Sequence, residues 1–82
     1  MKRSLTARNI NWISIQEPRG SLRVKAKIRN RHTAASATVV ADGADSVFVE
    51  FDEPQRAITP GQAVVFYQGH VVVGGGWIKE SQ

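Results

Sequence analysis

Positive side chains recur at every second position in one segment of this chain, between residues 22 and 31. Because successive side chains of a β-strand point to opposite faces, the alternation places the cations on one face and Val24, Ala26 and Ile28 on the other. Like charges in a row repel one another, but a row about 26 Å long suits an anionic backbone. The candidate binding residues are therefore Arg23, Lys25, Lys27, Arg29, Arg31 and, as an extension of the segment, His32.

A plainer interpretation of the same residues also stands. The cations would then form a solvated strand face, partly neutralised by Glu50 and Asp52 from a neighbouring strand. Exposed ion pairs of that kind contribute only about 0–1 kcal/mol each to stability. Binding to phosphates would instead draw on counterion release, which gives affinity without sequence preference.

Residues suited to catalysis or metal binding do not form a convincing set. The chain has no cysteine, which excludes disulfides, a thiolate nucleophile and cysteine-based zinc sites. His32 and His70 are the only histidines, and neither has metal-ligand spacing to another. Nothing in the sequence places Ser46, Asp45 and His70 together as a triad. We therefore predict no catalytic residue, no metal and no cofactor in this chain.

Length and composition limit the possible architecture. With 82 residues, the chain suffices for one small domain covering residues 1–82, with residues 1–4 and 80–82 expected to be frayed. The net charge of +4 and the pI of about 10.1 favour an anionic partner. No apolar run approaches the roughly 18–20 residues of a membrane span, and the first residues lack the apolar stretch of a signal peptide. We expect a cytoplasmic protein without a membrane partner.

Short apolar runs alternate with turn signals along the chain, and helical periodicity is weak. Pro60-Gly61 suits the centre of a type II turn, and Gln68-Gly69 suits a two-residue hairpin loop. Gly74-Gly75-Gly76 indicates a barrel corner or bulge rather than a phosphate cradle, because no helix follows it. We expect core packing for Trp12, Trp77, Phe48 and Tyr67, and stacking on bases is the alternative for them. The pattern predicts an all-β, small antiparallel barrel of six to seven strands, at about residues 6–15, 22–31, 36–41, 47–52, 63–67, 70–73 and 77–79.

The last third of the chain carries a specific series of residues. It reads Phe51-Asp-Glu-Pro-Gln-Arg-Ala-Ile-Thr-Pro-Gly-Gln-Ala-Val-Val-Phe-Tyr67, followed by Gly74-Gly-Gly-Trp-Ile78. Together with the upstream segments at residues 11–13 and 24–29, this series resembles the C-terminal barrel of bacterial tRNA-specific 2-thiouridylases. The resemblance runs from about Leu5 to Ile78. It implies a barrel similar to the second domain of translation elongation factors.

The resemblance also implies a function. Enzymes of that family make 2-thiouridine at the wobble position of tRNA, activate the uridine with ATP and transfer sulfur through cysteines. This chain has no such cysteines, and Gly43-Ala44-Asp45-Ser46 matches only the end of the family's ATP loop, Ser-Gly-Gly-x-Asp-Ser. Asn30 stands where the family usually has an aromatic residue. The resemblance thus implies a non-catalytic domain that contacts tRNA, with ATP bound in another domain of the same enzyme.

Two other functions remain compatible with the sequence. The barrel could be a structural scaffold that packs on the catalytic domain of the same enzyme and contacts RNA little. It could also be a free-standing barrel with a role in translation. The basic residues favour the tRNA-contacting domain, and the apolar residues between them are compatible with all three.

Overall fold

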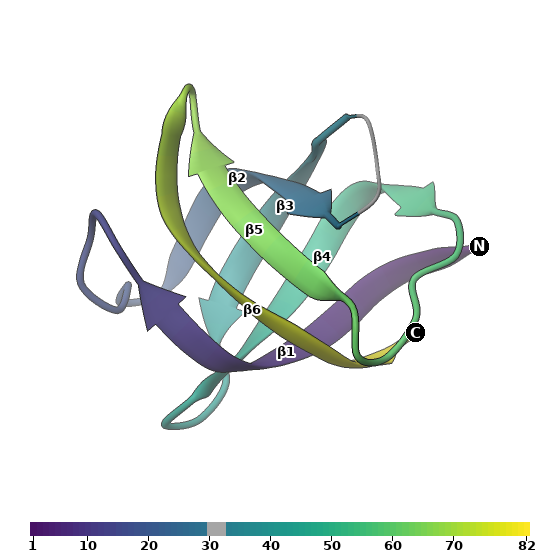
Figure 1. Ribbon diagram of the computed structural model, residues 1–82, viewed down its shortest axis with the longest axis horizontal. Coiled ribbons are helices and arrows are strands. Elements are labelled where there is room, and N and C mark those ends of the chain that lie inside the picture. The colour runs from purple at the N-terminus through teal and green to yellow at the C-terminus, as the bar shows by residue number, and fades with distance from the viewer. Residues whose placement is uncertain (30–32) are drawn as a thin grey trace.

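Six antiparallel strands close into a barrel in the computed structural model, which describes residues 1–29 and 33–82 (Figure 1). The predicted all-β fold and antiparallel barrel are confirmed, with the lower of the two expected strand numbers. Within the described residues no helix is long and apolar enough to cross a membrane. The strands are β1 (Lys2–Trp12), β2 (Ser21–Ile28), β3 (Ala35–Ala41), β4 (Ser46–Gln55), β5 (Ala63–Gln68) and β6 (Val71–Ser81).

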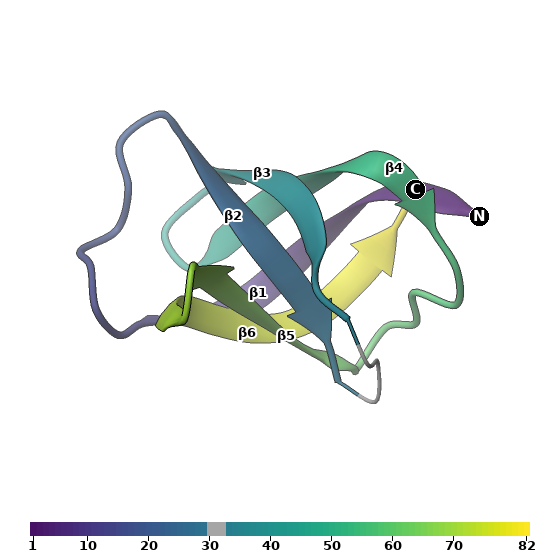
Figure 2. The same cartoon turned by 90° about the horizontal axis from the view of Figure 1, so that it is seen from above.

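The order of the strands around the barrel is β1-β4-β3-β2-β5-β6, and β6 returns to β1. Each strand is hydrogen-bonded on both sides, so the barrel has no open sheet edge. Hairpins join β3 to β4 and β5 to β6, whereas β2 pairs with β5 across a long separation in sequence. Figure 2 shows β2 crossing the molecule between β3 and β5. The order matters for function because it sets the neighbours of β2.

The core is filled by the side chains that alternate inward along each strand. Val24, Ala26 and Ile28 of β2 are buried, as the alternation predicted, and Phe51 and Phe66 are the largest fully buried side chains. Burial of such residues supplies most of the stability of a small domain. The other buried hydrophobic residues are Leu5, Ala7, Ala37, Val39, Val47, Val49, Ile58, Val64, Val73 and Ile78.

Both ends of the chain belong to strands. We expected residues 1–4 and 80–82 to be frayed, and the first strand to span residues 6–15. Instead β1 begins at Lys2 and ends at Trp12, and the backbone amides of Arg3 and Ser4 donate to the carbonyl of Gln82 at 2.9 and 3.0 Å. The N- and C-termini accordingly lie close together in Figure 1. The barrel closes through this pairing, which the local sequence does not reveal.

Three other strand limits differ from expectation. β2 ends at Ile28 rather than at residue 31, and Arg29 lies in the turn that follows. β4 continues past Pro54 to Gln55. Residues 71–73 and 77–79, which were expected in two separate strands, belong to one strand, β6, with Gly74-Gly75-Gly76 in its middle instead of at a corner between strands.

The three glycines of β6 allow neighbouring strands to approach closely. A Cβ on Gly75 would lie 2.7 Å from the carbonyl oxygen of Val64 in β5, and a Cβ on Gly74 would lie 2.8 Å from the carbonyl oxygen of Asn11 in β1. Both distances are too short for a side chain, and backbone atoms cannot move away easily. The pairing of β6 also shifts register on both sides near these glycines. Their role is therefore to fit β6 between β1 and β5.

The turns follow the sequence signals with one shift. The amide of Gln62 donates to the carbonyl of Thr59 at 3.3 Å, and Gly61 has φ of +90°, which confirms the type II turn. The β5–β6 loop consists of Gly69 and His70, one residue later than expected, because Gln68 pairs with Val71. Gly69 takes the positive φ, +61°, at the first loop position. The shift places His70 at the tip of a hairpin.

Candidate functional site

The basic residues of β2 lie on the outside of the barrel. Arg23 and Lys25 are exposed, Lys27 is half-buried, and Arg29 is exposed in the turn after the strand. The amide of Arg29 still donates to the carbonyl of Ala63 at 2.9 Å, so this residue continues the pairing with β5. The other two candidate residues, Arg31 and His32, lie outside the described residues, as does Asn30.

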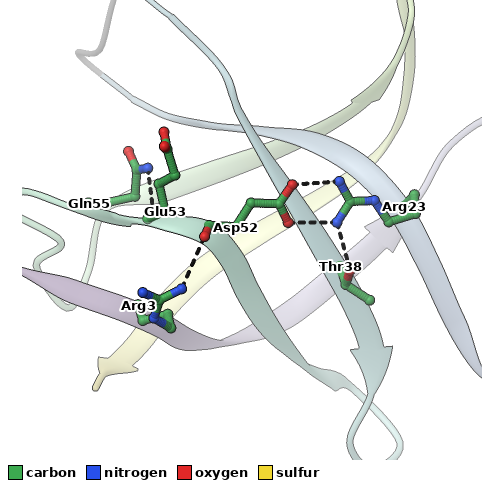
Figure 3. Close-up of polar contacts among 6 residues, drawn as sticks. All are labelled: Arg3, Arg23, Thr38, Asp52, Glu53 and Gln55. Carbon is green, nitrogen blue, oxygen red and sulfur yellow. Dashed lines mark hydrogen bonds and ion pairs between the residues drawn. The ribbon is translucent and has the colours of Figure 1, made fainter.

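Arg23 is held by an acidic partner on β4. Its two terminal nitrogens each donate to one carboxylate oxygen of Asp52 at 2.7 Å, and one of them also donates to the hydroxyl of Thr38 at 3.0 Å (Figure 3). Because β3 lies between β2 and β4, the Arg23 side chain crosses β3 and passes over Thr38 to reach Asp52. The expected neutralisation by Asp52 thus applies to Arg23.

The ion pair changes the acidity of both partners. The hydrogen bonds from Arg23 hold the pKa of Asp52 below its ordinary value against the opposing effect of desolvation, and the charges of Arg23 and Lys25 add to that lowering. The same hydrogen bonds and the charge of Asp52 raise the pKa of Arg23. Both side chains are about half exposed, so water screens much of this attraction. Asp52 also accepts a hydrogen bond on its backbone carbonyl from Arg3 of β1, at 3.0 Å (Figure 3).

Lys25, Lys27 and Arg29 form no ion pair with any of residues 1–29 or 33–82. Lys25 lies near two acidic residues, since it lines a polar hollow together with Ser36, Asp52 and Glu53. Within the alternating row, the cations that have no ion pair in the described chain therefore lie after Arg23, toward the C-terminal end of β2. The cations of the alternating row are not equivalent.

A tyrosine and a histidine adjoin the two lysines. Tyr67 of β5 pairs directly with Lys25, and both residues line a hollow of about 350 Å³ with Lys27 and His70. An aromatic ring beside lysines can stack on a base while the ammonium groups meet phosphates. We call Lys25, Lys27, Arg29, Tyr67 and His70 the basic face.

Sequence reasoning missed two members of the basic face. Tyr67 was expected in the core, with base stacking as the alternative, and His70 was considered only as a metal ligand and as part of a triad. The alternation in β5 was a usable signal, because buried Val64 and Phe66 put Tyr67 on the outer face. The sequence did not show that β5 lies beside β2, so it did not show what Tyr67 would face.

The residues considered for a triad serve as turn residues instead. Asp45 accepts a hydrogen bond from the backbone amide of Ile10 at 3.0 Å, and the Ser46 hydroxyl donates to the carbonyl of Asp42. Figure 1 shows the β3–β4 turn, which holds both residues, at the opposite end of the view from the β5–β6 turn with His70. The described residues hold no group of three or more histidine, aspartate or glutamate side chains placed to bind a metal ion.

The two tryptophans differ in their surroundings. Trp12 is half-buried and stacks on Phe66 with ring centroids 6.2 Å apart, as expected of a core residue. Trp77 is 46% exposed, so the prediction that it packs in the core is wrong. Its position follows from β6, in which Ile78 faces inward and Trp77 outward.

Known proteins resemble the chain over nearly its whole length. A family model described as the aminomethyltransferase beta-barrel domain matches residues 2–78. The chain belongs to this family. This description refers to a domain, and the individual relatives show in which proteins such a domain occurs.

Relatives of this beta-barrel domain include bacterial tRNA-specific 2-thiouridylases. The chain is 55% identical to tRNA-specific 2-thiouridylase MnmA of Koribacter versatilis over 78 residues, which are 95% of this chain and 21% of the relative. It is 54% identical to the protein of the same name from Solibacter usitatus, over 96% of this chain and 22% of the relative. For Clostridioides difficile MnmA the identity is 49%, over 98% of this chain and 22% of the relative. The predicted resemblance to 2-thiouridylases is confirmed, and the chain spans about a fifth of these relatives' length.

Proposed function

We propose that this barrel is the tRNA-contacting accessory domain of a tRNA 2-thiouridylase, with the basic face as its contact surface. The observation that carries the proposal is that Lys25 and Lys27, which have no ion-pair partner in the described chain, share a hollow with Tyr67 and His70. Arg29, which also has no such partner, follows them in the turn after β2. The names of the relatives supply the substrate class, since each is called tRNA-specific. Arg31 and His32 remain candidate contacts on the strength of the sequence.

The basic face suits structured RNA better than a small ligand. Its hollow is shallow and its charges follow a strand, so it can follow a phosphate backbone but cannot enclose a molecule. Lysine and arginine bind phosphates largely through counterion release, which gives little sequence preference. The domain would thus hold the body of the tRNA, and the choice of tRNA would be made elsewhere in the enzyme.

The chemistry of thiolation would lie in other parts of the enzyme. This chain has no cysteine to carry sulfur, and its Gly43–Ser46 segment forms a hairpin turn. ATP and the sulfur-transferring cysteines, which the resemblance to 2-thiouridylases implies, would belong to the catalytic domain. A tRNA partner is also the reason that we expect the protein in the cytoplasm.

The test is a titration of the purified chain with unmodified tRNA, followed by backbone amide shifts at several salt concentrations. With three phosphate contacts, log K should fall with log salt at a slope of roughly −2 to −3, and non-specific affinity should lie near 10⁻⁴–10⁻⁶ M. The variant Lys27→Gln with Arg29→Gln should make the slope shallower by about 1.5–2. Shifts should centre on Lys25–Arg29 and Tyr67–His70.

A matched control removes the same charge elsewhere. Arg8→Gln with Lys79→Gln takes two exposed cations from β1 and β6 and lowers the net charge equally. This variant should change the slope by less than half as much. Equal effects of the two double variants would mean that only net charge attracts tRNA, and the basic face would then not be a binding surface.

A further inference from the structure

A second outer face of the barrel is apolar and open to solvent. Ile13 is 63% exposed and Trp77 46% exposed, at two ends of a hollow of about 320 Å³. Between them, the wall is formed by Val65 of β5 and Val72 of β6. We call Ile13, Val65, Val72, Gly75 and Trp77 the apolar face.

The glycines of β6 line the hollow. Ile13 is joined to β6 by a hydrogen bond from its amide to the carbonyl of Val73 at 2.9 Å, and Trp77 directly follows Gly76. The three residues between Val73 and Trp77 are glycines, so the surface between the two large side chains carries none of its own. A protruding apolar side chain of a partner would find space there.

The chemistry of this face differs from that of the basic face. The residues that line its hollow are apolar residues, glycines and the two asparagines Asn9 and Asn11, and none is charged. A phosphate backbone would find no counter-charge there, whereas an apolar protein surface would remove a tryptophan and an isoleucine from water. Exposed tryptophans beside a pocket are typical of protein interfaces, where they contribute a large share of the binding energy.

The length of the relatives indicates which protein surface would cover the apolar face. Their polypeptides continue for about four fifths of their length beyond the part that matches this chain. A domain in the same polypeptide is present at high effective concentration, so a small apolar contact is enough to hold it in place. We propose that the apolar face packs against an apolar surface of another domain of the same 2-thiouridylase chain. The inference rests on the size of the relatives and does not depend on tRNA contact by the basic face.

The experiment compares the isolated chain with a chimera. In the chimera this chain replaces the matching part of the Koribacter versatilis relative, to which it is 55% identical. Hydroxyl-radical footprinting with mass spectrometry then measures oxidation of Trp77, with Tyr67 on the basic face as the control. Oxidation of Trp77 should fall at least about fivefold in the chimera without tRNA, and oxidation of Tyr67 should stay within about twofold.

Several outcomes would overturn the proposal. Equal oxidation of Trp77 in the isolated chain and in the folded chimera would show that nothing covers the apolar face. Protection of Trp77 only after tRNA is added would assign the face to RNA. Protection in the isolated chain that grows with its concentration would assign it to a second copy. Protection of Tyr67 by tRNA tests the proposed function separately, so the two results cannot be confused.

A variant and a second measurement guard against a chimera that does not fold. Oxidation of the half-buried Trp12 reports whether the barrel is intact. Trp77→Ser should leave the isolated chain folded, because the side chain is half exposed, and should at least halve the protection of Ile13 in the chimera. If Trp12 is oxidised as in unfolded protein, the labelled chain is titrated with the relative lacking its own barrel. Amide shifts at residues 72–77 would then support the proposal, and their absence would overturn it.

Discussion

The basic face and the apolar face are built on overlapping strands but carry opposite chemistry. β5 contributes to both, with Tyr67 beside the lysines of β2 and Val65 in the wall of the apolar hollow. Inward-facing neighbours such as Val64 and Phe66 serve the same core under both faces. The difference teaches that the inner residues of this barrel specify the fold, whereas the outer residues of two or three adjacent strands form the surfaces for which we propose partners.

The largest expected effect comes from a substitution in the core, which tests whether β2 alternates between core and solvent. Replacing Ile28 with Gln puts an amide without partners into the core, where the side chain is 3% exposed. The lost burial and the unsatisfied amide together should cost about 3–5 kcal/mol, enough to unfold a domain of this size under most conditions. Urea unfolding followed by tryptophan fluorescence measures the change. Lys27→Gln, one residue away on the outer side, should change stability by less than about 0.5 kcal/mol. Similar losses from both would mean that β2 does not alternate between core and solvent.

The glycines that line the apolar hollow provide a second test. Gly75→Ala brings a Cβ to 2.7 Å from the backbone oxygen of Val64, so β5 and β6 must separate or distort. We expect a loss of about 1–3 kcal/mol in the free energy of unfolding. Val72→Ala, on the outer side of the same strand, is the comparison variant and should cost less than Gly75→Ala. A neutral Gly75→Ala would show that close approach of the strands is not what requires glycine there.

Within the basic row, Arg23 and Lys27 should differ in RNA binding. Arg23 is held by Asp52, whereas Lys27 has no ion-pair partner among the described residues. Lys27→Gln should make the salt slope of tRNA binding shallower by about 0.7–0.9, and Arg23→Gln by less than half of that. Asp52→Asn should steepen the slope, because it removes a negative charge and releases Arg23. Equal losses for Arg23→Gln and Lys27→Gln would indicate that the Arg23–Asp52 pair opens when RNA binds.

The smallest expected effect concerns acid stability. Because Arg23 lowers the pKa of Asp52 in the folded state, their pair stabilises the fold above the ordinary aspartate pKa of about 3.9. This contribution is lost as the pH falls through the lowered pKa, since Asp52 then takes up a proton. Asp52→Asn should therefore reduce the loss of stability between pH 7 and pH 2.5. Thermal unfolding at both pH values measures it, with Glu53→Gln as control. An unchanged loss in Asp52→Asn would show that screening by water leaves the pair without effect on stability.

Much of the barrel could be predicted from short-range patterns. The alternation of Val24, Ala26 and Ile28 with cations predicted which side of β2 is buried, and the Pro60-Gly61 turn has its expected form. Both depend on interactions within a few residues of chain, where the geometry of a strand or turn leaves few alternatives. The extents of β1, β4 and β6 were less predictable, because a strand continues wherever a partner is available.

The sequence by itself determined the class of the fold, the family and the row of cations on one side of β2. The tertiary structure alone decided which cations are neutralised. Arg23 and Asp52 are 29 residues apart in sequence, and they form an ion pair across β3, which lies between their two strands. It likewise placed Tyr67 and His70 beside the lysines, through the pairing of β2 with β5. It also left Trp77 exposed beside a hollow that is lined by the glycines of β6. The physical reason is that alternation along a strand is local, whereas the choice of neighbouring strand depends on closing the whole barrel.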